Sequence, residues 1–131
     1  MESEHMKTIL VVENLTAVQH FLRETLESKG YKTLGATNGN KAYDVLLNHA
    51  QTTNLVLMDY HLPESNGYDL IKKIKANPEL QNIPVIFLTA ESDPDIIKVV
   101  EELGYTAWIK IPYRAHILLQ EVEKAIGGNQ P

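Results

Sequence analysis

Oxygen-bearing side chains follow three short apolar runs of this sequence: the pair Glu13-Asn14, then Asp59, then Thr89. Mg²⁺ prefers oxygen ligands and commonly takes only one or two carboxylates, with water and phosphate completing its shell. A carboxylate can also act as a nucleophile that forms an aspartyl phosphate, and a nearby hydroxyl can hydrogen-bond a phosphoryl oxygen. Taken singly, Asp59 suits a turn or helix cap equally well, and Thr89 suits the end of a strand. Together, the three positions predict a site for a hard cation and a phosphoryl group.

The elements that must position these residues can be predicted from hydrophobic periodicity. The apolar runs are continuous rather than alternating, which favours strands of a parallel sheet that is covered on both faces. A less apolar segment, Tyr31 to Ala36, is typical of an edge strand. The four apolar runs are Ile9–Val12, Leu55–Met58, Val85–Leu88 and Ala107–Ile109.

Helical patterns separate the predicted strands. The first begins at Thr16, where Thr16 and Gln19 are interpreted as a capping box, carries an apolar stripe and stops at Gly30. The others are predicted from 41 to 49, from Gly67 to Ala76, from Asp93-Pro94 to about Gly104, and from Ala115 to Ile126. The apolar stripe of the first helix is Val18, Phe21, Leu22 and Leu26; that of the last is Ala115, Leu118, Leu119, Val122 and Ile126.

The fivefold alternation predicts an α/β fold: a doubly wound five-stranded parallel sheet with five helices, in one domain. In such sheets the ligand site lies outside the carboxyl ends of the strands. Glu13-Asn14, Asp59, Thr89 and Ile111-Pro112 all fall at those ends.

Length and composition agree with one globular domain. The 131 residues carry a net charge of −5, and the sequence has no cysteine, which excludes disulfides and thiolate metal sites. A nucleic-acid surface needs clustered basic residues, so we expect no nucleic acid to bind this domain. With no apolar run of about 20 residues, we expect no membrane partner and a cytoplasmic location. We interpret residues 1–5 as a cloning remnant, 6–127 as the domain, and 128–131 as a C-terminal tail or the start of a linker.

Three sequence blocks resemble the signature blocks of response-regulator receiver domains in two-component signalling. They are Ile9 to Glu13, Leu57 to Pro63 with Gly67 behind it, and Pro84 to Ala90, and they fall in the order typical of that family. The similarity covers essentially residues 6–127.

The resemblance implies a flavodoxin-like fold and a set of site residues. Asp59 would accept a phosphoryl group from a histidine kinase or phosphotransfer protein. Mg²⁺ would be held by Glu13, Asn14, Asp59 and the backbone carbonyl of His61. Thr89 would contact the transferred phosphoryl group.

A partner surface is also implied, around the last predicted strand. After phosphorylation, Trp108 would change rotamer and alter the surface that a downstream protein partner binds. Tyr105 and Tyr113 fall on the same surface. Core packing is the competing interpretation, and it is the favoured one for Trp108.

Two positions depart from the family pattern. Asn14 stands where a second carboxylate is usual, so Mg²⁺ binding should be weaker; it equally suits a cap for the following helix. Aligning Gly104, Trp108 and Pro112 with the family places Ile111 at the usual lysine position. Lys110 is one residue early and should point to the opposite face, unless a bulge redirects it. Ile111-Pro112 can still be the cis peptide that the family has here.

Three functional interpretations are distinguished. The first is a phosphoacceptor receiver with an altered site, which at most catalyses its own phosphorylation and dephosphorylation. The second is a pseudo-receiver that acts as a phosphorylation-independent interaction module. A stand-alone phosphohydrolase is disfavoured, because His61 fills the position where such enzymes carry a second Asp. A direct chemical role for the His61 imidazole is likewise disfavoured.

Overall fold

The structure is a computed structural model, and it describes residues 6–62, 67–90, 94–102, 104 and 107–127. Its strands form one parallel sheet in the order β2-β1-β3-β4-β5. The predicted five-stranded parallel sheet is confirmed, and its strand order is that of flavodoxin-like folds. The strands are β1 Thr8–Val12, β2 Lys32–Ala36, β3 Thr53–Asp59, β4 Val85–Thr89 and β5 Ala107–Lys110.

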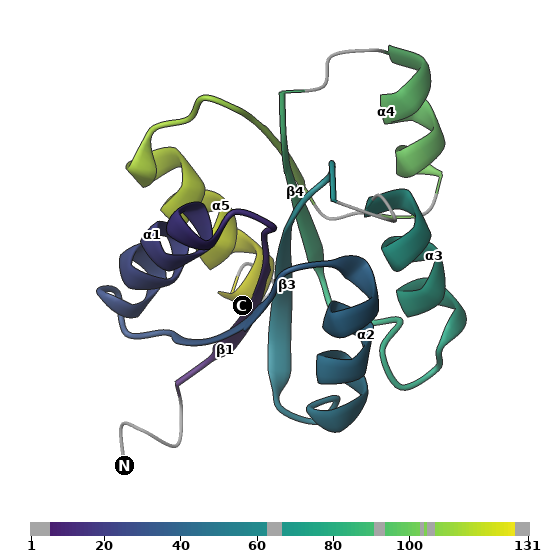
Figure 1. The fold of residues 1–131 in the computed structure, drawn as a ribbon, viewed down its shortest axis with the longest axis horizontal. Helices are drawn as coiled ribbons and strands as arrows, with labels where there is room; N and C mark the ends of the chain where they lie inside the picture. The colour runs from purple at the N-terminus through teal and green to yellow at the C-terminus, as the bar shows by residue number, and fades with distance from the viewer. Residues whose placement is uncertain (1–5, 63–66, 91–93, 103, 105–106, 128–131) are drawn as a thin grey trace.

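The helices pack on the two faces of this sheet. Figure 1 shows α1 and α5 on one face and α2 and α3 on the other, so that the sheet is the middle of three layers. The helices are α1 Thr16–Glu27, α2 Gly39–Asn48, α3 Gly67–Ala76, α4 Pro94–Glu101 and α5 Ala115–Gly127.

Two hydrophobic clusters, one on each face, hold the layers together. Alternate residues of β1, β3, β4 and β5 enter opposite clusters, which explains why the central strands are apolar at every position. We call them the α1/α5 cluster and the α2/α3 cluster. The first includes Ile9, Val11, Leu55, Leu57 and Leu22, and the second includes Leu10, Val12, Val56, Met58 and Ile71. β2 is less buried and lies at the sheet edge, as its composition predicted.

The start of α1 differs from the prediction. Its N-cap is Leu15, which makes no side-chain cap hydrogen bond, so the predicted Thr16–Gln19 capping box is wrong. Glu13 performs part of that role, because its Oε2 accepts a hydrogen bond from the Leu15 N–H at 2.9 Å. Gln19 instead donates to two strand carbonyls.

The predicted apolar stripe of α1 is only half correct. Leu22 and Leu26 are buried, but Val18 and Phe21 are 39% and 57% exposed. The helix also ends at Glu27, three residues before Gly30, whose φ of +94° suits the turn that follows. Among the described helices, none is both long and apolar enough to span a membrane.

Candidate functional site

Glu13 and Asp59 lie at the carboxyl ends of β1 and β3, which are hydrogen-bonded neighbours. Ile9 and Val11 of β1 face the α1/α5 cluster, as do Leu55 and Leu57 of β3. Because side chains alternate along a strand, Glu13 and Asp59 emerge on this same face, one step beyond the cluster. The sheet therefore brings these two predicted site residues together.

The Glu13 carboxyl is nearly enclosed, with 5% of the residue exposed. Burial raises the pKa of this carboxyl, and the Asp59 carboxylate beside it raises the pKa further, while the Leu15 N–H opposes both effects. The two carboxyls are close enough for their side chains to hydrogen-bond. Such a pair is a region of concentrated negative potential, which a cation would relieve.

Asp59 is the last residue of β3 and is half-buried. Its Oδ1 accepts a hydrogen bond from the His61 N–H at 3.0 Å, and the next residue, Tyr60, donates its N–H to the Leu88 carbonyl at 3.1 Å. These bonds fix the two residues that immediately follow Asp59. The His61 side chain is exposed, with its ring edge-on to Tyr60 at 5.2 Å between centroids.

Thr89 ends β4 one residue beyond Leu88, which pairs with Asp59. Thr89 is completely buried, and because Val85 and Phe87 of β4 face the α2/α3 cluster, alternation directs the Thr89 side chain to the face opposite Asp59 within the strand. Its main-chain carbonyl accepts a hydrogen bond from the Ile111 N–H at 2.8 Å, which ties the end of β4 to the end of β5. Asn14, in contrast, is exposed beside Glu13.

The register of β5 bears on whether Lys110 can reach Asp59. β5 pairs with β4 without interruption from Ala107 to Lys110, so the described strand has no bulge there. Ala107 and Ile109 face the α1/α5 cluster and Trp108 faces the other. Alternation then directs Lys110 to the face opposite Asp59 and directs Ile111, which is 37% exposed, to the face of Asp59. The Ile111–Pro112 bond is cis, as the resemblance implied.

The predicted partner-surface residues have different surroundings. Trp108 is half-buried, with its ring 5.7 Å from that of Tyr60 and 5.6 Å from that of Phe87, which agrees with core packing. Tyr113 is also half-buried against the α1/α5 cluster, and burial together with the charge of Glu13 raises the pKa of its hydroxyl. Tyr105 lies outside the described residues.

The donor set at the site suits Mg²⁺ in kind. Glu13 and Asp59 offer carboxylate oxygens, and Asn14 offers an amide oxygen. Within the described residues, no group of three or more His, Asp or Glu side chains converges as in a metal cage built by protein alone. Mg²⁺ needs no such cage, since it keeps several waters and often takes only one or two carboxylates. Glu13, Asn14 and Asp59 are thus compatible with a weakly held Mg²⁺ ion.

The fold and this paired-carboxyl site define a class of protein, and comparison with known proteins names it. The family described as response regulator receiver domain matches residues 9–123. This chain belongs to that family, and hence to two-component signalling. Receiver domains generally bind Mg²⁺ and interact with histidine kinases and downstream effectors.

Individual relatives match over nearly their whole length. The chain is 30% identical to the chemotaxis protein CheY1 of Helicobacter pylori, covering 92% of this chain and 98% of the relative. It is also 30% identical to the polar-differentiation response regulator DivK of Brucella anthropi, covering 92% and 97%. Among solved structures, the receiver domain of a signal transduction histidine kinase from Syntrophus aciditrophicus is 32% identical, with a TM-score of 0.85 over 95% of this chain and 92% of that one.

Sequence reasoning missed one residue of the site region. Gln19 was assigned to a helix cap, whereas its amide reaches back to the ends of two strands. A polar residue on the side of α1 that faces the sheet was the available signal.

Proposed function

We propose that this receiver domain accepts a phosphoryl group on Asp59 from a histidine kinase or a phosphotransfer protein, in a site altered at Asn14 and Ile111. The observation that carries this proposal is the pair of adjoining carboxyls, Glu13 and Asp59, at the ends of neighbouring strands in a member of this family. A structural role alone does not require two acids to share a partly desolvated position.

The proposed reaction is a single phosphoryl transfer. A carboxylate oxygen of Asp59 forms a bond to phosphorus as the bond from phosphorus to the donor's imidazole nitrogen breaks, and the leaving imidazole takes a proton from solvent. Bound Mg²⁺ would supply positive charge to the phosphoryl oxygens. Glu13 and Asn14 would hold that ion with the His61 carbonyl. Thr89, at the very end of β4, would have to turn its hydroxyl towards Asp59 to hydrogen-bond the transferred group.

The two substitutions should slow this reaction without abolishing it. Losing one preorganised donor to developing charge typically costs on the order of 10²–10³ in rate. Ile111 has no donor, and Lys110 is directed to the other face of β5. Asn14 adds an oxygen but no charge, so a site with one anion fewer should hold Mg²⁺ less tightly.

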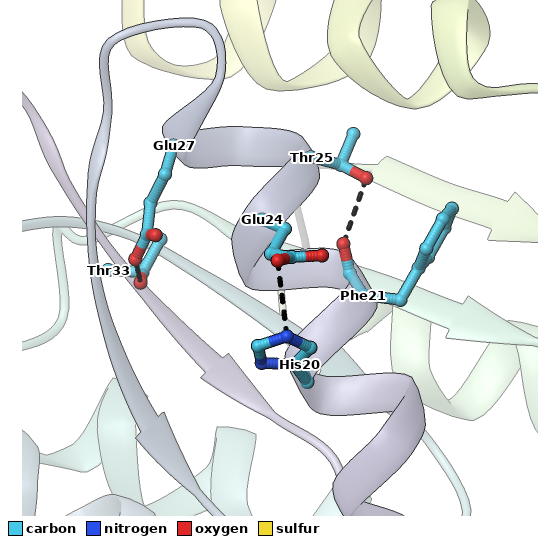
Figure 2. Close-up of polar contacts among 6 residues, drawn as sticks. All are labelled: His20, Phe21, Glu24, Thr25, Glu27 and Thr33. Atoms are coloured by element: carbon cyan, nitrogen blue, oxygen red, sulfur yellow. Dashed lines mark hydrogen bonds and ion pairs between the residues drawn. The ribbon is translucent and has the colours of Figure 1, made fainter.

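An exposed apolar row at the start of α1, formed by the N-cap Leu15 with Val18 and Phe21, is the proposed docking surface for the phosphodonor protein. Leu15, Val18 and Phe21 are 58%, 39% and 57% exposed, and spacings of three place successive members on one side of the helix. The row begins two residues after Glu13, so a donor helix lying on it could present its histidine to Asp59. Figure 2 shows the Phe21 side chain beside Thr25, whose hydroxyl donates to the Phe21 carbonyl at 2.9 Å.

The test is phosphorylation by a small phosphodonor in the presence of Mg²⁺. We expect a mass gain of one phosphoryl group that hydroxylamine removes, that is absent in Asp59→Asn, and that is retained in Asp44→Asn, an exposed acid on α2. A wild-type protein that gains no mass from the small donor or from a cognate kinase would contradict the proposal.

That negative outcome would favour the alternative, a pseudo-receiver that binds its partner without phosphorylation. The loss of the lysine at Ile111 is the observation that keeps this alternative in view. Under it, Asp59→Asn would leave partner binding unchanged.

A further inference from the structure

Gln19 joins the end of β1, which carries Glu13, to the end of the neighbouring strand β2. Its Nε2 donates one hydrogen bond to the main-chain carbonyl of Glu13 and another to that of Ala36, both at 3.1 Å. The Ala36 carbonyl also accepts the Glu13 N–H at 3.0 Å. One side-chain amide thus clamps the point where β1 leaves the sheet and the chain turns towards α1.

A chain of polar contacts orients this amide. The Gln19 Oε1 lies 3.5 Å from Nη1 of Arg23, one turn further along α1. Arg23 is held in turn by Thr33 on β2, whose hydroxyl and carbonyl accept from Nε and Nη2 at 2.9 and 3.2 Å. The Thr33 hydroxyl also donates to Glu27, a contact visible in Figure 2. Because the carbonyl end of the amide faces Arg23, its N–H end faces the strand carbonyls.

Gly35 of β2 leaves the space that the Gln19 amide fills. A Cβ added there would lie 2.2 Å from Oε1 of Gln19 and 2.7 Å from Nη1 of Arg23. Both atoms are the far ends of flexible side chains, so an alanine would displace them rather than the sheet. The Gly35 backbone is not in the left-handed region, so the alanine itself is tolerated.

We infer that Gln19 is a positioning residue for the site, and that Gly35 is its necessary companion. By fixing the Glu13 carbonyl, Gln19 sets the direction in which the Glu13 and Asn14 side chains leave the strand. The inference rests on the proposed function, because it takes these residues to hold Mg²⁺. Groups that orient metal ligands typically change metal affinity by about 10–100-fold when they are removed.

The experiment measures Mg²⁺ affinity by NMR titration of the isotope-labelled protein with the metal alone, for Gln19→Ala, Gly35→Ala and the double variant. We expect each single variant to weaken Mg²⁺ binding by about tenfold, at the low end of that range. The double variant should be no weaker than Gln19→Ala, because Gly35→Ala acts by displacing an amide that is then absent. Gly127→Ala is the matched control, since a Cβ there meets nothing within 4 Å.

Gln19→Glu separates positioning from charge. It keeps the shape of the side chain but removes both N–H donors, and it adds a negative charge near the site. An electrostatic effect alone would tighten Mg²⁺ binding, whereas loss of positioning weakens it. Unchanged or tighter binding in Gln19→Ala and Gln19→Glu would overturn the inference, as would a double variant whose losses multiply.

Failure of the proposed function would look different. If the wild-type protein gains no phosphoryl group but Mg²⁺ affinity still follows the pattern above, the proposed phosphorylation fails and the positioning role of Gln19 stands. If phosphorylation occurs and the Gln19 variants bind Mg²⁺ like the wild type, the reverse holds. A wild-type protein without measurable Mg²⁺ binding would overturn both.

Discussion

Gly67, the first residue of α3, is packed so closely that a single methyl group should destabilise the protein. A Cβ at this position would lie 2.5 Å from Cε1 of Phe87 and 3.0 Å from Cδ1 of Tyr60. Neither ring has open space to move into, because Phe87 is completely buried and Tyr60 is 6% exposed. Their rings also pack edge-on against each other, with 5.5 Å between centroids. Gly67→Ala therefore forces either the rings or the start of α3 to shift.

The expected cost follows from two opposing effects. Overpacking a core typically costs about 1–3 kcal/mol, and replacing glycine in a helix returns up to about 1 kcal/mol. Because two buried rings are in the way, we take the middle of the overpacking range, about 2 kcal/mol, and after the return of up to about 1 kcal/mol the free energy of unfolding should fall by about 1–2 kcal/mol. For a domain of 131 residues, each 1 kcal/mol should lower Tm by roughly 3–5 °C, so we expect a drop of about 3–10 °C.

Thermal and urea unfolding, followed by circular dichroism and tryptophan emission, measure this change. Trp108 is the only tryptophan in the sequence, and its ring lies against both Phe87 and Tyr60, so its native emission should shift as well. Gly127→Ala, on the last residue of α5, controls for the removal of a glycine and should leave Tm unchanged or slightly higher. If Gly67→Ala melts at or above the wild-type temperature, the close packing of Gly67 described above is refuted.

Three further changes test the altered site and its docking surface. Asn14→Asp adds a negative charge at an exposed position, worth about 2 kcal/mol or roughly thirtyfold in affinity for the doubly charged Mg²⁺ at about 4 Å with water-like screening; a metal titration against Asn48→Asp, an exposed control on α2, should show the difference. Ile111→Lys restores a donor on the face of Asp59 and should speed phosphorylation by a small donor on the order of tenfold or more, with no change in rate counting against the assigned position. Phe21→Ser should slow transfer from a donor protein but not from a small phosphodonor, whereas Leu47→Ser, at a comparably exposed position on α2, should slow neither.

The sheet was predictable because its physical signal is local and redundant. Runs such as Ile9–Val12 and Val85–Leu88 are apolar at every position, and only a strand covered on both faces needs that pattern. Because alternating strands and helices form a parallel sheet, the carboxyl ends of β1 and β3 must lie at the same end of the sheet. The predicted position of Asp59 needed no side-chain detail.

The start and surface of α1 were not predictable in the same way. A helical period marks every apolar residue within a broad arc, so it could not distinguish Leu22, which is buried, from Phe21, which is 57% exposed. The capping-box pattern likewise could not show that Glu13 would take the Leu15 N–H and leave Gln19 to reach the strands. Those choices depend on the packing of α1 against β1 and β2, which lies beyond any local window.

The position of Ile111 shows how a one-residue offset can change chemistry while the fold stays intact. Lys110 and Ile111 are adjacent in the sequence, yet strand alternation directs them to opposite faces of the sheet. The two hydrophobic clusters that hold the fold do not depend on whether position 110 or position 111 carries the lysine, because Ile111 is 37% exposed and Lys110 is exposed. The rate of a reaction that builds charge at the Asp59 carboxylate, in contrast, depends on whether the lysine lies on the same face as Asp59. Stability and reactivity are therefore separable at this end of β5, and Ile111→Lys should alter the second with little effect on the first.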